Sequence, residues 1–73
     1  MTPAQSKAAR ALLGWSQTEL ARRAGVSRST VTDFELESRQ VAPESLTKIK
    51  PALEKAGVQF INGKRPGVRL VIG

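Results

Sequence analysis

Four polar side chains on one short helix could form hydrogen bonds to the edges of nucleic-acid bases. The helix that Ser27 opens turns Val31 and Phe34 inward, at the spacing of one helical face. Its outer face then carries Arg28, Ser29, Thr32 and Asp33. A rigid helix with a short polar outer face is what entry into the major groove of a DNA duplex requires.

The segment before this helix predicts a second helix and a tight turn that would position it. Ser16 and Glu19 have the spacing of a capping box, which marks a helix start. The buried stripe of that helix is predicted to be Leu20, Ala21 and Ala24. A small residue such as Ala21 lets two helices approach closely, and Gly25 supplies the left-handed backbone that a tight turn between them requires.

A further helix is predicted near the start of the chain. Thr2 with Gln5 forms another capping box, Pro3 suits the first helical position, and Gly14 ends the segment. The residues predicted to face inward are Ala4, Ala8, Ala11 and Leu12.

The last predicted helix begins near Pro43 and ends at Gly57. Its inward residues are predicted to be Leu46, Ile49, Leu53 and Ala56. Pro51 lies inside this pattern. Because proline lacks a backbone donor and clashes with the preceding turn, we expect a kink or a break into two short helices there.

After Gly57 the apolar spacing changes from a helical period to the two-residue period of a strand. Val58 and Phe60 alternate with a polar residue, and the apolar residues 68, 70 and 72 form a second alternating run. Residues 62–67, which read Asn-Gly-Lys-Arg-Pro-Gly, are rich in turn formers. The pattern predicts a C-terminal β-hairpin, which would be marginally stable by itself.

The composition argues against catalysis and in favour of a polyanionic partner. The 73 residues contain no cysteine and no histidine, and the six acidic residues are scattered. The sequence therefore presents no nucleophile–base pair and no metal-ligand set, so we expect no enzyme activity, cofactor, metal or small-molecule substrate. Twelve Lys and Arg residues give a net charge of +6, which attracts nucleic acid. An anionic membrane surface is the alternative, but it would need a lysine-rich amphipathic helix.

The spaced residues of the central segment resemble the lambda-repressor-like helix-turn-helix class, which includes phage repressors, Cro proteins and bacterial Xre-type regulators. The resemblance covers roughly residues 5–60, and its marks are Leu13-Gly14-Trp15-Ser16-Gln17, Glu19-Leu20-Ala21, Ala24-Gly25-Val26-Ser27, Val31 and Phe34-Glu35. It implies a mainly α fold of four to five helices with a short C-terminal β-hairpin. We expect residues 1–57 to form the DNA-binding domain and residues 58–73 to form the hairpin or tail.

The resemblance also implies roles for individual residues in binding double-stranded DNA. Residues matching or flanking the base-reading positions are Arg28, Ser29, Asp33 and Thr32. Arg28 is the best candidate for a bidentate contact to guanine, and Asp33 could accept a hydrogen bond from a cytosine amino group. Gln17 matches a position that contacts a phosphate at a helix N-terminus, and Ser27 matches a second backbone-contacting cap.

Two basic residues complete the implied site. Arg10 matches a residue that forms a partly buried salt bridge with Glu35 and ties the first helix to the third. Arg39 is a further candidate for phosphate contact. Relatives often have glycine directly after the recognition helix, whereas this chain reads Glu35-Leu36-Glu37-Ser38-Arg39. The helix must therefore end through Ser38 or another residue in a left-handed conformation.

Plainer interpretations stand beside these roles. Gln17 and Arg28 could be solvated helix residues, and Asp33 could serve to hold Arg28 or Ser29 in place. Trp15 is expected to pack at the end of the first helix. With three aromatic residues in all, the chain does not resemble a binder of single-stranded nucleic acid, which usually presents several stacking platforms.

A single small unit makes few base contacts, so members of this class generally act as two-fold dimers. The hairpin residues expected to contribute to a homodimer are Phe60, Ile61, Val68, Leu70 and Ile72. The alternative is that the hairpin folds back on its own helical core. The resulting hypothesis is a cytoplasmic transcriptional regulator that occupies an operator. The other hypothesis is an antitoxin-like module that also binds a toxin-like partner protein.

Overall fold

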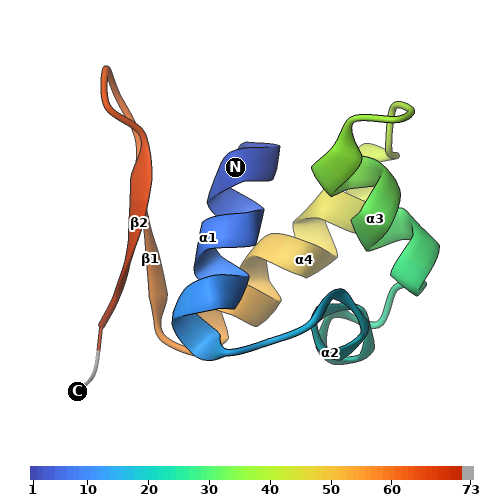
Figure 1. Ribbon diagram of the computed structural model, residues 1–73, viewed down its shortest axis with the longest axis horizontal. Helices are drawn as coiled ribbons and strands as arrows, with labels where there is room; N and C mark the ends of the chain where they lie inside the picture. Colours follow the sequence, from blue (N-terminus) through green and yellow to red (C-terminus); the bar gives the residue numbers. More distant parts are fainter. Residues whose placement is uncertain (72–73) are drawn as a thin grey trace.

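Residues 1–71 form four helices followed by two strands. The computed structural model describes residues 1–71 (Figure 1). The helices are α1 (Pro3–Leu13), α2 (Gln17–Ala24), α3 (Arg28–Leu36) and α4 (Pro43–Lys55), and the strands are β1 (Val58–Ile61) and β2 (Gly67–Leu70). The predicted mainly α fold with a C-terminal hairpin is therefore confirmed. Ile72, one of the predicted dimer residues, lies outside the described residues.

The predicted starts of α1, α2 and α3 are present as side-chain caps, whereas α4 begins at Pro43 without one. Thr2 and Gln5 form the reciprocal capping box of α1. Ser16 accepts a hydrogen bond from the backbone N–H of Glu19, but the reciprocal half of that box is absent from the described residues. The Glu19 carboxylate binds two arginines of α2 instead, because charged partners compete with the cap for its oxygens. Ser27 caps α3 through the N–H of Thr30.

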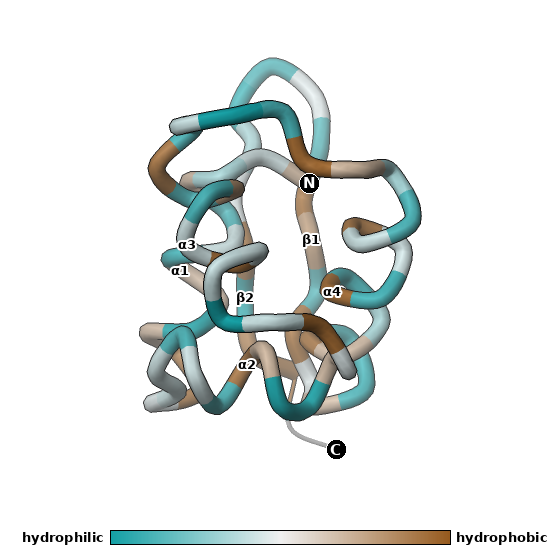
Figure 2. Tube along the Cα trace, turned by 90° about the vertical axis from the view of Figure 1, so that its right-hand side faces the viewer, coloured by the Kyte–Doolittle hydropathy of each residue, from teal (hydrophilic) through white to brown (hydrophobic). Residues whose placement is uncertain are grey.

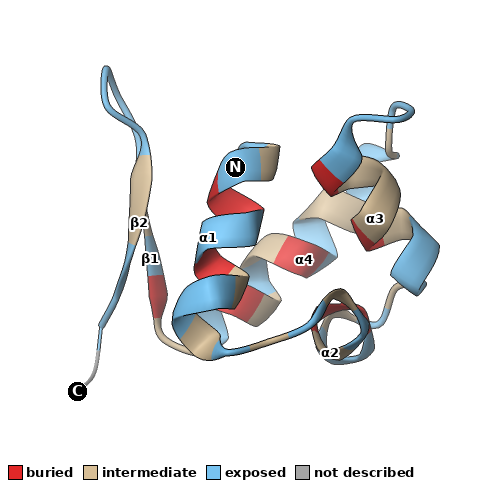
Figure 3. Ribbon diagram, viewed as in Figure 1, coloured by how far each residue is buried: buried red, intermediate tan, exposed pale blue. Residues whose placement is uncertain are grey.

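The hydrophobic core lies where the four helices meet the start of the hairpin. Its buried apolar residues are Ala9, Leu20, Ala21, Val31, Ile49, Leu53 and Val58. Figure 3 shows buried residues on all four helices and at the start of β1. In the tube coloured by hydropathy, hydrophobic and hydrophilic residues alternate along the helices, as expected for amphipathic helices (Figure 2).

The predicted inward face of α1 is wrong. Ala4, Ala8, Ala11 and Leu12 are all exposed, and the buried residues of α1 are Gln5, Ser6 and Ala9. Alanine has little apolar surface to bury, so a stripe of alanines orients a helix weakly. The orientation of α1 is instead set by two buried polar side chains that find hydrogen-bond partners. The Gln5 amide binds the hairpin, and the Ser6 hydroxyl binds α3.

The break expected within α4 is also absent. Pro51 lies inside one continuous helix from Pro43 to Lys55. Ile49 and Leu53, on either side of it, are fully buried, while Pro51 itself is exposed. The core contacts of these two residues hold the helix together across the position that lacks a backbone donor.

The hairpin packs on the side of α1 that is remote from α3 (Figure 1). Val58 pairs with Leu70 and Phe60 pairs with Val68 in an antiparallel register. Val58 is buried, and Phe60 and Val68 pack against the core, so one face of the hairpin does fold back on the helices. Exposed apolar surface remains at Ile61, Leu70 and Val71, which are 42%, 36% and 51% exposed.

Candidate nucleic-acid interface

The α2–α3 pair is closed by a tight turn at Gly25. This residue has φ 72° and ψ 32°, the left-handed conformation that glycine adopts without strain. Its N–H and that of Val26 return to carbonyls of the last turns of α2, and Val26 donates to Ala21 at 3.0 Å. Leu20 and Val31 are fully buried between the helices. The turn and the buried contacts make the pair a rigid support for the outer face of α3.

The N-terminal turn of α3 presents free polar groups. Arg28 and Ser29 are exposed, as is the cap Ser27. Within residues 1–71 the Arg28 guanidinium takes part in no ion pair. The Ser29 hydroxyl lies 3.1 Å from that of Ser27. Because Arg28 and Ser29 are exposed, the described part of the chain leaves this turn of α3 open to a DNA groove.

Thr32 and Gln17 face each other across the helix pair. The Thr32 hydroxyl donates to the Gln17 side-chain carbonyl at 2.8 Å, and the Gln17 amide nitrogen donates to Glu35 at 3.1 Å. Both side chains are therefore engaged inside the protein. The backbone at the start of α2 remains available for an anion, since the first N–H groups of a helix lack partners within it.

Glu35 is a buried carboxylate at the junction of three helices. It is 1% exposed and forms the salt bridge with Arg10 at 2.7 Å, as the resemblance implied. Arg10 donates a second hydrogen bond to it at 2.9 Å, and the Ser6 hydroxyl donates at 2.6 Å. Burial raises the pKa of Glu35, but the hydrogen bonds from Arg10, Ser6 and Gln17 together outweigh it, so the pKa lies below its ordinary value. The carboxylate is charged at neutral pH and fixes α1, α2 and α3 to one another.

Asp33 and Arg39 form a clasp at the C-terminal end of α3. The Arg39 guanidinium donates to one Asp33 oxygen at 2.5 Å, and the Ser38 hydroxyl donates to the other at 3.0 Å. The hydrogen bond from Arg39 is the main reason that the pKa of Asp33 is lowered. The partner that Asp33 holds is thus Arg39, where the sequence suggested Arg28 or Ser29. Glu37, with φ 55°, is the non-glycine left-handed residue through which the helix ends.

Two residues of this interface were not predicted. Ser6 lies one helical turn before Arg10, so the same face of α1 reaches Glu35 twice, and this spacing could have indicated it. Ser38 follows Asp33 by five residues, beyond the helix end, where no spacing rule indicates a contact. Across residues 1–71 no group of three potential ligands could hold a metal ion, and no helix combines the length and apolarity needed to cross a membrane.

Comparison with known proteins shows a family and a solved structure to which this chain is similar. A family model described as Helix-turn-helix matches residues 7–50, more than half of the chain. Among solved structures, HipB in the structure of the HipA-HipB-O2-O3 complex is similar, with a TM-score of 0.64 and 31% sequence identity. That match covers 71% of this chain and 73% of the other. No curated protein sequence matches.

Proposed function

Because the chain belongs to the helix-turn-helix family of the Xre/Cro, lambda-repressor-like type, we propose that it regulates transcription by occupying a specific site on double-stranded DNA. It is a DNA-binding domain of that family. The observation that supports sequence-specific binding is the exposed N-terminal turn of α3, where Arg28 is free to contact bases.

In the proposed complex α3 lies in the major groove, and Arg28 forms a bidentate contact to guanine while Ser29 contacts a neighbouring base. Thr32 is less exposed than Arg28 and Ser29, and its hydroxyl donates to Gln17. It therefore contributes to base reading only at the edge of the interface between α3 and the DNA bases. Phosphate contacts come from the start of α2 at Gln17 and from the cap Ser27. These contacts would neutralise several phosphates, so log affinity should fall with log salt by roughly 0.9 for each phosphate neutralised.

Asp33 has a different proposed role from its neighbours. Both of its oxygens accept hydrogen bonds within the protein, which leaves the carboxylate poorly suited to a cytosine amino group. We propose that it positions Arg39 beside a phosphate. Asp33→Asn should then weaken binding to all sequences about equally and leave base preference unchanged. A change in the preferred base at one position would instead make Asp33 a base-reading residue.

The test of the whole proposal is selection of bound sequences from a random duplex library. A symmetric consensus with two half-sites is expected for the wild type, and its spacing reports the dimer geometry. Arg28→Ala should relax preference at one position of each half-site, by about 1–3 kcal/mol of discrimination. Gln17→Ala is the control. It removes the side-chain contacts to Thr32 and Glu35 that hold the start of α2 beside its phosphate, so it should weaken binding across sequences. Equal losses on all sequences for both variants would contradict base reading by Arg28.

A homodimer is part of the proposal, and the exposed apolar residues of the hairpin segment support it. These are Ile61 and Leu70, on opposite faces of the two-stranded sheet, and Val71 directly after it. Within the described residues neither strand pairs with a third one, so both sheet edges are open. Ile61→Lys should raise the dimer dissociation constant in sedimentation equilibrium without unfolding the chain, because this side chain is exposed. An unchanged constant would exclude Ile61 from the interface. We propose a cytoplasmic location, where such a dimer would meet DNA.

A second candidate function is an antitoxin-like module that binds a partner protein as well as DNA. The similarity to HipB, solved in a complex with HipA, favours it. The test is co-expression with the product of an adjacent reading frame, followed by purification on a tag carried by this chain. Stoichiometric co-purification that survives high salt would support the second function, and its absence would leave DNA binding alone.

A further inference from the structure

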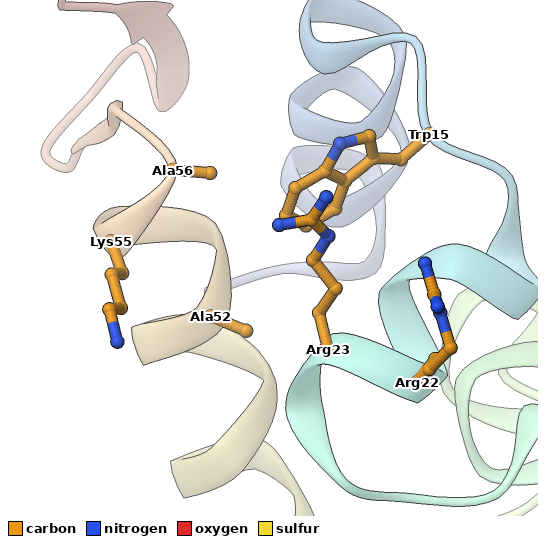
Figure 4. Close-up of a pocket in the computed structure, with 6 residues that line it drawn as sticks. All are labelled: Trp15, Arg22, Arg23, Ala52, Lys55 and Ala56. Carbon is orange, nitrogen blue, oxygen red and sulfur yellow. The ribbon is translucent and has the colours of Figure 1, made fainter.

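A solvent-facing groove lies between the last turns of α2 and α4, outside the surface assigned to DNA. It measures about 530 Å³ and is lined by Trp15, Arg22, Arg23, Ala52, Lys55 and Ala56, which we call the α2–α4 groove (Figure 4). No residue of α3 lines it. An occupant of this groove would therefore contact different residues from those proposed to read DNA bases.

The walls of the α2–α4 groove are cationic. Three of the six lining residues are basic and none is acidic. The side chains of Arg22 and Arg23 are 74% and 54% exposed. Glu19, beside the groove, holds both guanidinium groups, at 2.8 Å from Arg22 and 2.7 Å from Arg23. The contacts described leave other N–H groups of both arginines open to an incoming anion, in the fork geometry that suits carboxylates.

The Trp15 indole and the Arg23 guanidinium stacked on it form the floor of the groove. The Arg23 guanidinium lies 4.7 Å from the centroid of the Trp15 ring, and Figure 4 shows the two stacked. The indole is half-buried and packs against the core. On the opposite wall the small side chains of Ala52 and Ala56 leave the groove open. The space between this stacked pair and the two alanines accommodates an apolar side chain, and the cations around it accommodate flanking carboxylates.

The remainder of this chain offers no suitable occupant. Of its six acidic residues, Glu19, Asp33 and Glu35 already bind arginines. The other three, at positions 37, 44 and 54, are isolated from one another in the sequence. A second copy would therefore bring single carboxylates, whereas the groove presents three cations.

We propose that the α2–α4 groove binds an acidic segment of a partner protein, with its carboxylates on Arg22, Arg23 and Lys55 and an apolar side chain against Trp15. The apolar half of the lining favours a peptide over a DNA backbone, which has phosphates but no apolar side chains to place there. This inference goes beyond DNA binding and does not depend on it. Partner and DNA would bind at the same time.

The single tryptophan of the chain makes the proposal testable in the intact protein. The probe is an octapeptide that alternates Glu with Leu, and its control replaces every Glu with Gln. Titration is followed by the fluorescence of Trp15. The acidic peptide should change the emission, and the neutral peptide should not. Arg22→Gln with Arg23→Gln should weaken peptide binding roughly five- to tenfold, a size typical of two exposed charge pairs.

Two controls separate groove binding from general charge effects. Arg65→Gln removes a positive charge from the β1–β2 turn, away from the groove, and should leave peptide affinity unchanged. Lys55→Gln replaces a single exposed groove cation and carries the test if the double arginine variant fails to fold. Equal weakening by Arg65→Gln, or equal binding of the neutral peptide, would overturn the proposal.

Duplex DNA supplies the remaining arm of the experiment. Affinity for DNA should be the same with and without saturating acidic peptide, and the groove variants should reduce it no more than Arg65→Gln does. If DNA displaces the peptide and the groove variants lose DNA affinity selectively, the groove contacts nucleic acid and the partner-protein proposal is wrong. If neither the wild type nor any variant binds DNA while the wild type still binds the acidic peptide, the proposed function is refuted and the proposal for the α2–α4 groove is supported.

Discussion

Replacement of Glu35 by glutamine should destabilise the fold by about 2–3 kcal/mol at pH 7. Breaking one partner of a buried ion pair typically costs about 3–5 kcal/mol. Two features of this site reduce that figure. The Arg10 side chain is 19% exposed, so water can solvate part of its charge, and glutamine still offers Ser6 an acceptor oxygen. Since a domain of this size has an unfolding free energy of roughly 5 kcal/mol, the change is about half of it.

The assay is urea unfolding of the wild type and Glu35→Gln over a range of pH. Because hydrogen bonds hold the pKa of Glu35 below its ordinary value of 4.5, its stabilising effect is complete above that pH. It is lost as the pH falls through the lowered pKa of the folded protein. The wild type should therefore lose stability below about pH 5 more steeply than the variant, and the two should converge in acid.

A double variant tests whether the effect belongs to the pair. Arg10→Met combined with Glu35→Met should lose less than the sum of the two single changes, since the uncompensated charge is gone. Two results together would refute the role assigned to this carboxylate. The unfolding free energies of Glu35→Gln and the wild type would agree within about 0.5 kcal/mol at pH 7, and both would fall equally steeply with pH in acid.

Three further substitutions test the backbone and the hairpin. Glu37→Gly should raise the unfolding free energy by about 0.5–1 kcal/mol, because glycine adopts φ 55° without strain. Thermal unfolding measures this gain in stability, and the control Glu37→Ala should show none. Gly57→Ala should lower stability by about 1–3 kcal/mol in urea, because φ is 110° and the new Cβ would lie 2.9 Å from the Val71 carbonyl oxygen. Gln5→Leu should increase amide hydrogen exchange in the hairpin while exchange in α3 stays unchanged, since the Gln5 amide donates to two hairpin carbonyls at 3.0 and 3.1 Å. Equal acceleration in α3 would show that this amide supports the whole fold.

The sequence predicted the elements well because their ends have local chemistry. Ser16 and Ser27 cap helices whatever surrounds them, and Gly25 takes the left-handed conformation of the turn that the motif requires. The strand period after Gly57 likewise identified the hairpin. Such signals act over three or four residues and can be read without the tertiary structure.

Features that depend on distant partners were predicted less well. The exposed alanine stripe of α1 could not show that Gln5 and Ser6 would be buried and would bind partners 56 and 29 residues away. The charge of Asp33 suggested that it would bind a nearby polar residue, but the sequence did not identify that residue as Arg39. Arg39 reaches Asp33 only because the chain turns at the end of α3. The role of Arg10 came from resemblance, because spacing alone does not pair it with Glu35.

The hydrogen-bonded group at the junction of α1, α2 and α3 has an evolutionary consequence. Its members are Ser6, Arg10, Gln17, Thr32 and Glu35. Loss of Glu35 alone would leave Arg10 without a counter-charge, and loss of Arg10 alone would leave the Glu35 carboxylate unneutralised. A substitution at one of these sites should therefore be tolerated only with a matching substitution at another. We therefore expect these five positions to co-vary among descendants of a common ancestor, while Arg28 and Ser29 diverge freely as binding sites in the genome change.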